Sequence, residues 1–235
     1  MNEIITNIIL FASAFVSGLA VILFKLKFSK NLKLLISFSG AFLLAICVLH
    51  LIPEIFTNYS KRIGIFILIG FLLQLLLEFF SDGIEHGHFH SHGNELKIFP
   101  YAIFVSLCLH SFIEGMALID TNHIHNSTNS LLIGIIIHKI PIAVVLSTML
   151  IAKNTSKTLF VISLFVFAIS APLGLILSTN YAISIESTNI ILALAIGIFL
   201  HISTTILFES SEGHKFDLKK FIIVILGFAL AIFTL

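Results

Sequence analysis

The sequence predicts an all-α membrane protein whose chain crosses the bilayer several times. Of its 235 residues, 58% are hydrophobic and only 11% are charged, which is too apolar for a soluble domain of this size. Long apolar runs also recur along the whole chain, and each is close to the ~20 residues that a helix needs to cross a bilayer. We therefore treat residues 1–235 as a single transmembrane domain.

Eight transmembrane helices account for these apolar runs. We predict them at 4–24, 34–56, 63–80, 99–119, 131–152, 158–178, 188–208 and 220–235. The fourth and fifth spans contain most of the buried polar groups and separate two triplets of spans. We expect a 3+2+3 arrangement in which the triplets are inverted repeats, as in many transporters.

The positive charges between the spans predict the orientation of the chain. Odd-numbered linkers contain ten lysine and arginine residues and even-numbered linkers contain two, so the positive-inside rule places both termini outside the cytoplasm. Short linkers and the lack of a targeting extension favour a bacterial inner membrane. The oligomeric state is left open, with a homodimer as one option.

The linker at 81–98, SDGIEHGHFHSHGNELKI, is long, polar and rich in histidine. In the orientation above it is a cytoplasmic loop between the third and fourth spans. Its alternating histidines are His86, His88, His90 and His92. Flexible imidazoles capture metal ions weakly, so we expect a metal-gathering loop. The alternative is a solvated loop with no specific role.

The fourth and fifth spans contain ionisable groups that a bilayer tolerates poorly. His110 and Glu114 share one helix face, and counting the helical rise places His138 of the fifth span at a similar depth. Lys139 follows directly. A charged group at mid-membrane costs about 2.5–3.5 kcal/mol, so such groups line cavities or pair with one another. Two imidazoles and a carboxylate suit Zn²⁺, Fe²⁺ or Mn²⁺. The alternative is a hydrogen-bond network that holds the two spans together.

If the outer triplets of spans are inverted repeats, polar residues in the second and seventh spans would mark an entrance and an exit for the ion. His50 and Glu54 lie near the outer end of the second span, while His201 lies at mid-membrane and Glu209 at the inner end of the seventh. The alternative for each is an interfacial anchor or an internal hydrogen-bond partner. No phosphate-binding glycine loop, HExxH motif, nucleophile elbow or basic patch occurs, which argues against an ATP-driven pump and against nucleic-acid partners.

Five short motifs, in this order and spacing, resemble those of the ZIP (Zrt/Irt-like) metal transporters. They are HLIPE at 50–54, HSFIEG at 110–115, HKIPIA at 138–143, APLG at 171–174 and GIFLH at 197–201. The resemblance implies uptake of a divalent cation into the cytoplasm through a site between the fourth and fifth spans. It places His110, Ser111 and Glu114 on ligand positions, and His138 and Lys139 at the start of the fifth-span motif.

One departure from the family pattern concerns charge. Many members have a glutamate where this chain has Ile142, and an acidic or neutral ligand where it has Lys139. We expect the Lys139 ammonium to replace the second cation of a two-metal site and to neutralise Glu114. The chain is then predicted to carry one transport metal.

The function expected from these residues is alternating-access transport, with the cation as cargo and no resident cofactor. Zn²⁺ is the first candidate, although Fe²⁺, Mn²⁺ and Cd²⁺ suit the same mixed ligands. One rival is an intramembrane zinc-dependent lipid amide hydrolase that uses His110, His138 and His201. Another is a sensor that binds the ion without moving it.

Overall fold

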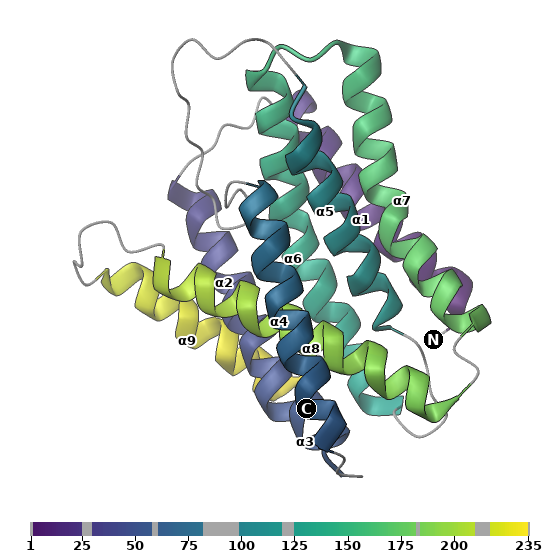
Figure 1. Cartoon of the computed structure of the whole chain (residues 1–235). Helices are drawn as coiled ribbons and strands as arrows, with labels where there is room; N and C mark the ends of the chain where they lie inside the picture. The colour runs from purple at the N-terminus through teal and green to yellow at the C-terminus, as the bar shows by residue number, and fades with distance from the viewer. Residues whose placement is uncertain are drawn as a thin grey trace.

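The fold is given by a computed structural model, which describes residues 2–24, 30–57, 61–81, 99–118, 125–181, 184–209 and 217–234. Within these ranges the chain forms helices and no strand, which confirms the all-α prediction (Figure 1). The helices are α1 (Glu3–Leu23), α2 (Lys30–Ile46), the π-helical η1 (Cys47–Leu51), α3 (Ile52–Ile55), α4 (Lys61–Ser81), α5 (Tyr101–Met116), α6 (His125–Ala152), α7 (Lys157–Tyr181), α8 (Ile185–Glu209) and α9 (Leu218–Phe233).

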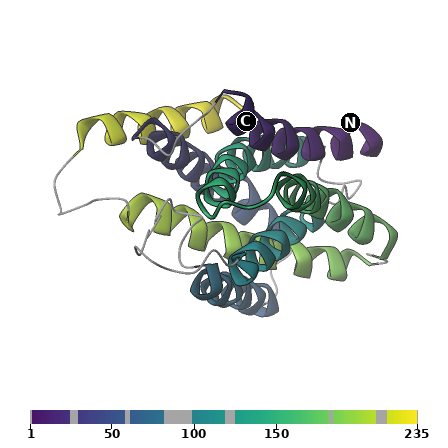
Figure 2. The ribbon, with the colours of Figure 1, turned by 90° about the horizontal axis from the view of Figure 1, so that it is seen from above.

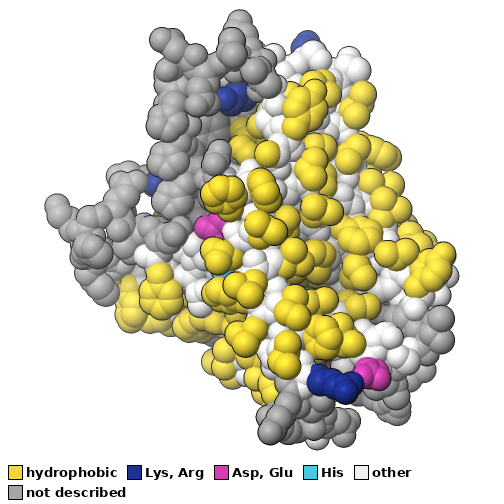
Figure 3. All heavy atoms as spheres, in the orientation of Figure 1, with side chains coloured by type: hydrophobic (Ala, Val, Ile, Leu, Met, Phe, Trp, Pro, Cys, Tyr) yellow, Lys and Arg dark blue, Asp and Glu magenta, His cyan; other side chains and the backbone are white. Residues whose placement is uncertain are grey.

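Because α2, η1 and α3 are continuous, these elements form eight helical runs, as the apolar pattern predicted. Six of the runs are long and apolar enough by themselves to cross a membrane, and α5 is a shorter apolar helix. Helix α6 begins at His125, earlier than the expected 131, because its first turns are built from polar residues that a hydropathy window passes over. The face of the molecule in Figure 3 is mainly hydrophobic, as contact with lipid tails requires.

The helices pack in two groups. In the first group α1 packs against α6 and α7, and α5 packs against α7. In the second group α4 packs against α8, and α2 packs against α8 and α9 (Figure 1). The groups meet where α2 contacts α6 and where α4 contacts α5. Viewed from above, α6 lies near the centre of the assembly (Figure 2).

Glycines allow the closest helix crossing in each group. A Cβ atom at Gly115 of α5 would collide with the Ala171 carbonyl of α7, and Gly174 of α7 is equally tight against the backbone of α5. In the second group, Gly70 of α4 and Gly197 of α8 leave no room for a Cβ atom against the partner backbone. Small residues at such crossings let backbones approach within van der Waals contact, which drives helix association in lipid.

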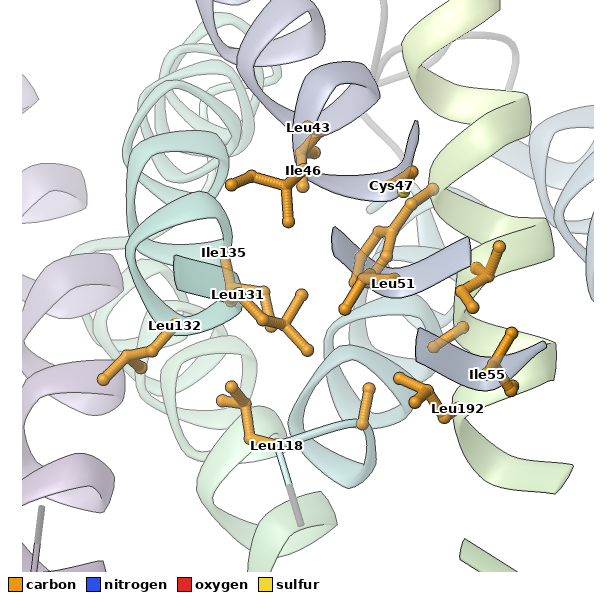
Figure 4. Close-up of a cluster of buried hydrophobic side chains, with 14 of the residues drawn as sticks. Leu43, Ile46, Cys47, Leu51, Ile55, Leu118, Leu131, Leu132, Ile135 and Leu192 are labelled. Carbon is orange, nitrogen blue, oxygen red and sulfur yellow. The ribbon is translucent and has the colours of Figure 1, made fainter. Parts of the chain in front are cut away.

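Buried apolar side chains lie on both sides of the expected metal site. One cluster joins the end of α2, η1 and α3 to the first half of α6 and the start of α8 (Figure 4). Its labelled members include Leu43, Leu51, Leu131 and Ile135, and Ile135 precedes His138 by about one helical turn. The second cluster joins the later half of α6 to α1 and α7. We call the first one the α3-side apolar cluster.

Candidate metal centre

Helices α5 and α6 bring two imidazoles and a carboxylate together. His110 and Glu114 are one turn apart on α5, and His138 faces them from α6. One potential ligand atom from each residue lies within 4.8 Å of the other two, and this is the only group of three such side chains in the described part of the chain. All three residues are buried, with at most 2% of their surface exposed.

The distances in this group are close to those of a tetrahedral metal site. Glu114 Oε1 lies 3.1 Å from His110 Nε2 and 3.9 Å from His138 Nε2. The two imidazole rings are 5.8 Å apart between centroids and nearly perpendicular. Ligands at about 2.0–2.2 Å from a zinc ion are about 3.3 Å from one another in a tetrahedron. The Glu114–His110 pair is already near this spacing, whereas the wider pairs, which are separated by up to 4.8 Å, would have to close around a bound ion by side-chain rotation.

Lys139 occupies the other side of the same carboxylate. Its Nζ donates hydrogen bonds to Glu114 Oε2 at 3.1 Å and to Ser111 Oγ at 2.7 Å. It also lies 5.6 Å from the centroid of the Phe167 ring of α7, which places the ammonium within reach of a cation–π contact. Because Lys139 is only 1% exposed, its positive charge is balanced inside the protein by Glu114 and not by water.

Helical geometry explains why two consecutive residues of α6 serve opposite sides of one carboxylate. Neighbouring positions on an α-helix point about 100° apart. His138 therefore approaches Oε1 while Lys139 reaches Oε2 and Ser111. The cluster contains one carboxylate and one ammonium, and these opposite charges offset much of the cost of burying either alone.

A second polar pair lies between α4 and α8. His201 Nδ1 is 3.3 Å from Glu78 Oε2, and the His201 ring packs edge-on against Phe71 at 4.7 Å between centroids. Gln74, one turn before Glu78 on α4, is completely buried. The sequence analysis missed Gln74 and Glu78. Their signal was present, because polar groups spaced by four residues inside an apolar span indicate a polar face.

The position of His201 argues against the hydrolase constellation. That alternative required the three histidines to share one ion, whereas the structure pairs His201 with Glu78 of α4. In the described part of the chain, His110 and His138 are grouped with Glu114 and with no third histidine.

The remaining candidate residues lie apart from the centre or beyond the described ranges. His50 lies in the π-helical turn η1 and Glu54 in α3, both partly buried at the end of the second span. Glu209 ends α8, but its side chain is outside the described part. The histidine-rich loop, with all four of its alternating histidines, also lies outside the described residues.

The fold and the side-chain cluster together point to an integral membrane protein with a buried group of two histidines and a glutamate that could hold a metal ion. The family model described as ZIP Zinc transporter matches residues 84–234, which is more than half of the chain. The chain belongs to this family of zinc transporters, and it is accordingly a divalent metal transporter and not an enzyme. A comparison with individual curated proteins gives no match.

Proposed function

We propose that this protein moves a single divalent cation, with zinc as the preferred cargo, into the cytoplasm by alternating access through His110, Glu114 and His138. The observation that carries this proposal is the convergence of three ligand atoms within 4.8 Å at a buried position between α5 and α6. Family membership supplies the class of function, and this geometry supports the location of the site.

The ligands available in this cluster suit an ion that must be released after it has bound. Two imidazoles and one carboxylate oxygen offer fewer protein ligands than a closed four-ligand zinc site, so binding is favourable but not final. Ser111 is a weaker candidate ligand. Its hydroxyl has two acceptor positions, and one is used by Lys139. Water would complete the coordination of the ion.

The Lys139 ammonium supports transport of one metal ion per cycle. It lies against Glu114 Oε2 and Ser111 Oγ, where it fills the space that a second cation would need. We expect one metal ion to bind between α5 and α6 in the wild type. A Lys139→Ala protein that still bound a single ion there, with unchanged uptake, would remove this role for the lysine.

The direction of transport rests on the charge bias of the linkers and on the apolar packing. If both termini are outside, the α3-side apolar cluster lies between the site and the outer face, and Glu78 and His201 lie toward the cytoplasm. This conformation would be closed to the outside. We propose His50 and Glu54 as the entrance, and Glu78, His201 and Glu209 as the exit. The histidine-rich loop at 81–98 would then gather the released ion.

The helix contacts support the inverted repeats of the 3+2+3 arrangement. An inverted repeat would relate four pairs of helices: α1 with α7, α2 with α8, α4 with α9, and α5 with α6. If each helix is replaced by its counterpart, the α4–α8 contact becomes the α9–α2 contact. The same exchange converts the α5–α7 contact into the α6–α1 contact, and these four are the most extensive contacts between helices. Repeats related in this way can exchange conformations, which opens the site to alternate sides of the membrane. A homodimer and a bacterial inner membrane stay predictions.

The test is zinc accumulation by purified protein in sealed vesicles. We expect uptake by the wild type and none by Glu114→Ala, with the folding of the variant checked by its elution from a sizing column. Binding of zinc without accumulation would favour the sensor. Uptake should also fall at acidic pH, because protons compete with the metal for imidazole nitrogens.

A further inference from the structure

The two oxygens of Glu114 have different partners. Oε1 faces the imidazoles of His110 and His138 at 3.1 and 3.9 Å, whereas Oε2 lies 3.1 Å from the Lys139 ammonium. A carboxylate chelates a metal with both oxygens only when both face the ion. As long as Lys139 holds Oε2, Glu114 can offer the cargo one oxygen only.

The ammonium is held in this position from three sides. Ser111 accepts its shortest hydrogen bond, at 2.7 Å, and Glu114 accepts the second. The third side is the ring of Phe167, which is 1% exposed and whose centroid lies 5.6 Å from Nζ. The face of an aromatic ring attracts a cation more strongly when both are desolvated, as they are here. An aliphatic side chain at 167 would fill similar space without attracting the charge.

The number of ligands available from the protein distinguishes between cations. Two nitrogens and one oxygen, completed by a water, make the four-coordinate arrangement that Zn²⁺ accepts readily. Mn²⁺ and Mg²⁺ favour six ligands that are mainly oxygen. A second Glu114 oxygen would serve these larger coordination numbers, and Lys139 withholds it.

We propose that Lys139 determines the specificity of the site by keeping Glu114 monodentate, and that Phe167 is the positioning residue that holds the ammonium in place. The pair favours the four-coordinate cation Zn²⁺ over the six-coordinate cation Mn²⁺. The inference rests on the proposed function in one respect, which is that the ion bound by His110, Glu114 and His138 is the cargo.

The experiment measures binding to the full-length protein in detergent. Five proteins are compared, namely the reference protein with the wild-type residues at these positions, Lys139→Met, Phe167→Leu, Phe167→Trp and the control Phe160→Leu. Each also has its loop histidines replaced by serine, so that the loop does not contribute binding. Competition between Zn²⁺ and Mn²⁺ gives the affinity ratio. The visible spectrum of bound Co²⁺ gives the coordination number, because tetrahedral Co²⁺ absorbs far more strongly than six-coordinate Co²⁺.

We expect an intense tetrahedral Co²⁺ spectrum from the wild type and a weak one from Lys139→Met. The preference for zinc over manganese should fall by about 10- to 100-fold in Lys139→Met, which is the usual range for removing a partner of a metal ligand. Phe167→Leu should shift both measurements in the same direction by a smaller factor, and Phe167→Trp, which keeps an aromatic face, should retain the wild-type values.

Phe160→Leu is the matched control. Phe160 is a buried phenylalanine of the same helix and the same apolar cluster. Its replacement costs similar packing and should leave the ratio and the spectrum unchanged. An unchanged ratio in Lys139→Met would overturn the specificity role. If that variant does not fold, a Phe167→Leu protein that matched Phe160→Leu would overturn the inference by itself.

These outcomes are separable from the proposed transport. The measurements need no vesicle, so a protein with the expected binding ratio that accumulated no zinc would contradict the proposed function and leave the inference standing. If the wild type accumulated zinc in vesicles but Lys139→Met kept the wild-type ratio of zinc to manganese affinity, the proposed function would stand and the inference about Lys139 would fail.

Discussion

Two of the histidine–glutamate contacts in the described part of the chain differ in what surrounds them. Glu114 meets His110, a second imidazole and an ammonium, and its side chain is 2% exposed. Glu78 meets His201 between α4 and α8, and its side chain is 16% exposed. Within the described residues, no third histidine, cysteine or carboxylate joins the second pair. The same two residue types therefore belong to a candidate metal centre in one place and form a contact between α4 and α8 in the other.

This difference indicates that the role of an intramembrane carboxylate depends on the side chains that contact it. At Glu114 the Lys139 ammonium contacts Oε2 and the imidazoles of His110 and His138 face Oε1, which under our proposal leaves one oxygen for the cargo. At Glu78 the imidazole of His201 and partial exposure would suit a brief contact with a passing ion, or a bond between α4 and α8. Removing each carboxylate in turn is the most direct way to test this comparison.

The largest effect is expected for Glu114→Gln. The substitution keeps the size of the side chain but removes the anionic oxygen between the two imidazoles. Zinc uptake should fall by about a hundredfold or more, since even losing a partner of a ligand costs 10- to 100-fold. Glu78→Gln, measured in the same vesicles, should retain a substantial fraction of wild-type uptake. Equal losses in the two variants would show that the two pairs do not differ in role.

The next effect concerns stability. Glu114→Gln leaves the Lys139 ammonium buried without its carboxylate, which costs about 3–5 kcal/mol when one partner of a buried pair is removed. The double variant Glu114→Gln, Lys139→Met removes both charges and should recover most of that loss. Denaturant unfolding in detergent measures the free energies. A double variant no more stable than the single one would mean that Glu114 and Lys139 do not depend on each other in the fold.

The sequence predicted the number of helices and the grouping of polar side chains from α5 and α6 for physical reasons. A bilayer requires long apolar runs, and spacing by four residues fixes His110 and Glu114 on one face. It could not show which helices pack together, because lipid-facing and protein-facing side chains are equally apolar. On α4, Leu72 is 61% exposed and Leu77 only 6%, although both are leucine.

Two further features escaped the sequence analysis for related reasons. The partner of Glu78 is His201, far along the chain, and no local pattern connects α4 with α8. The π-helical turn at Cys47–Leu51 precedes Pro53, and an apolar run has the same composition whether its hydrogen bonds span four residues or five. Composition therefore identifies that a segment crosses the membrane, while partner choice and helix irregularity depend on contacts across the fold.

A smaller loss of stability is expected when the glycine at a close helix crossing is replaced by alanine. Gly115 packs against the backbone of Ala171, so Gly115→Ala must push α5 away from α7 beside Glu114. Overpacking of this kind costs about 1–3 kcal/mol. Gly64 of α4 has open space around it, and Gly64→Ala is the matched control with no expected steric cost. Apparent melting temperatures in detergent compare the two. A stable Gly115→Ala protein with intact uptake would show that the crossing is not as close as described.

The smallest effect on zinc uptake should come from His201→Phe. This variant tests whether a residue can affect transport without affecting zinc affinity. His201 does not belong to the group of ligand atoms around Glu114, so equilibrium zinc affinity in detergent should stay at the wild-type value when the loop histidines are absent. Uptake should fall by about two- to fivefold, because an exit residue changes the height of a barrier without changing the depth of the main site. The matched variant is His110→Phe, which removes a ligand atom 3.1 Å from Glu114 Oε1 and should lower affinity and uptake together. If His201→Phe lowered zinc affinity as strongly as His110→Phe, the two histidines would share one site and the pairs compared above would be parts of a single centre.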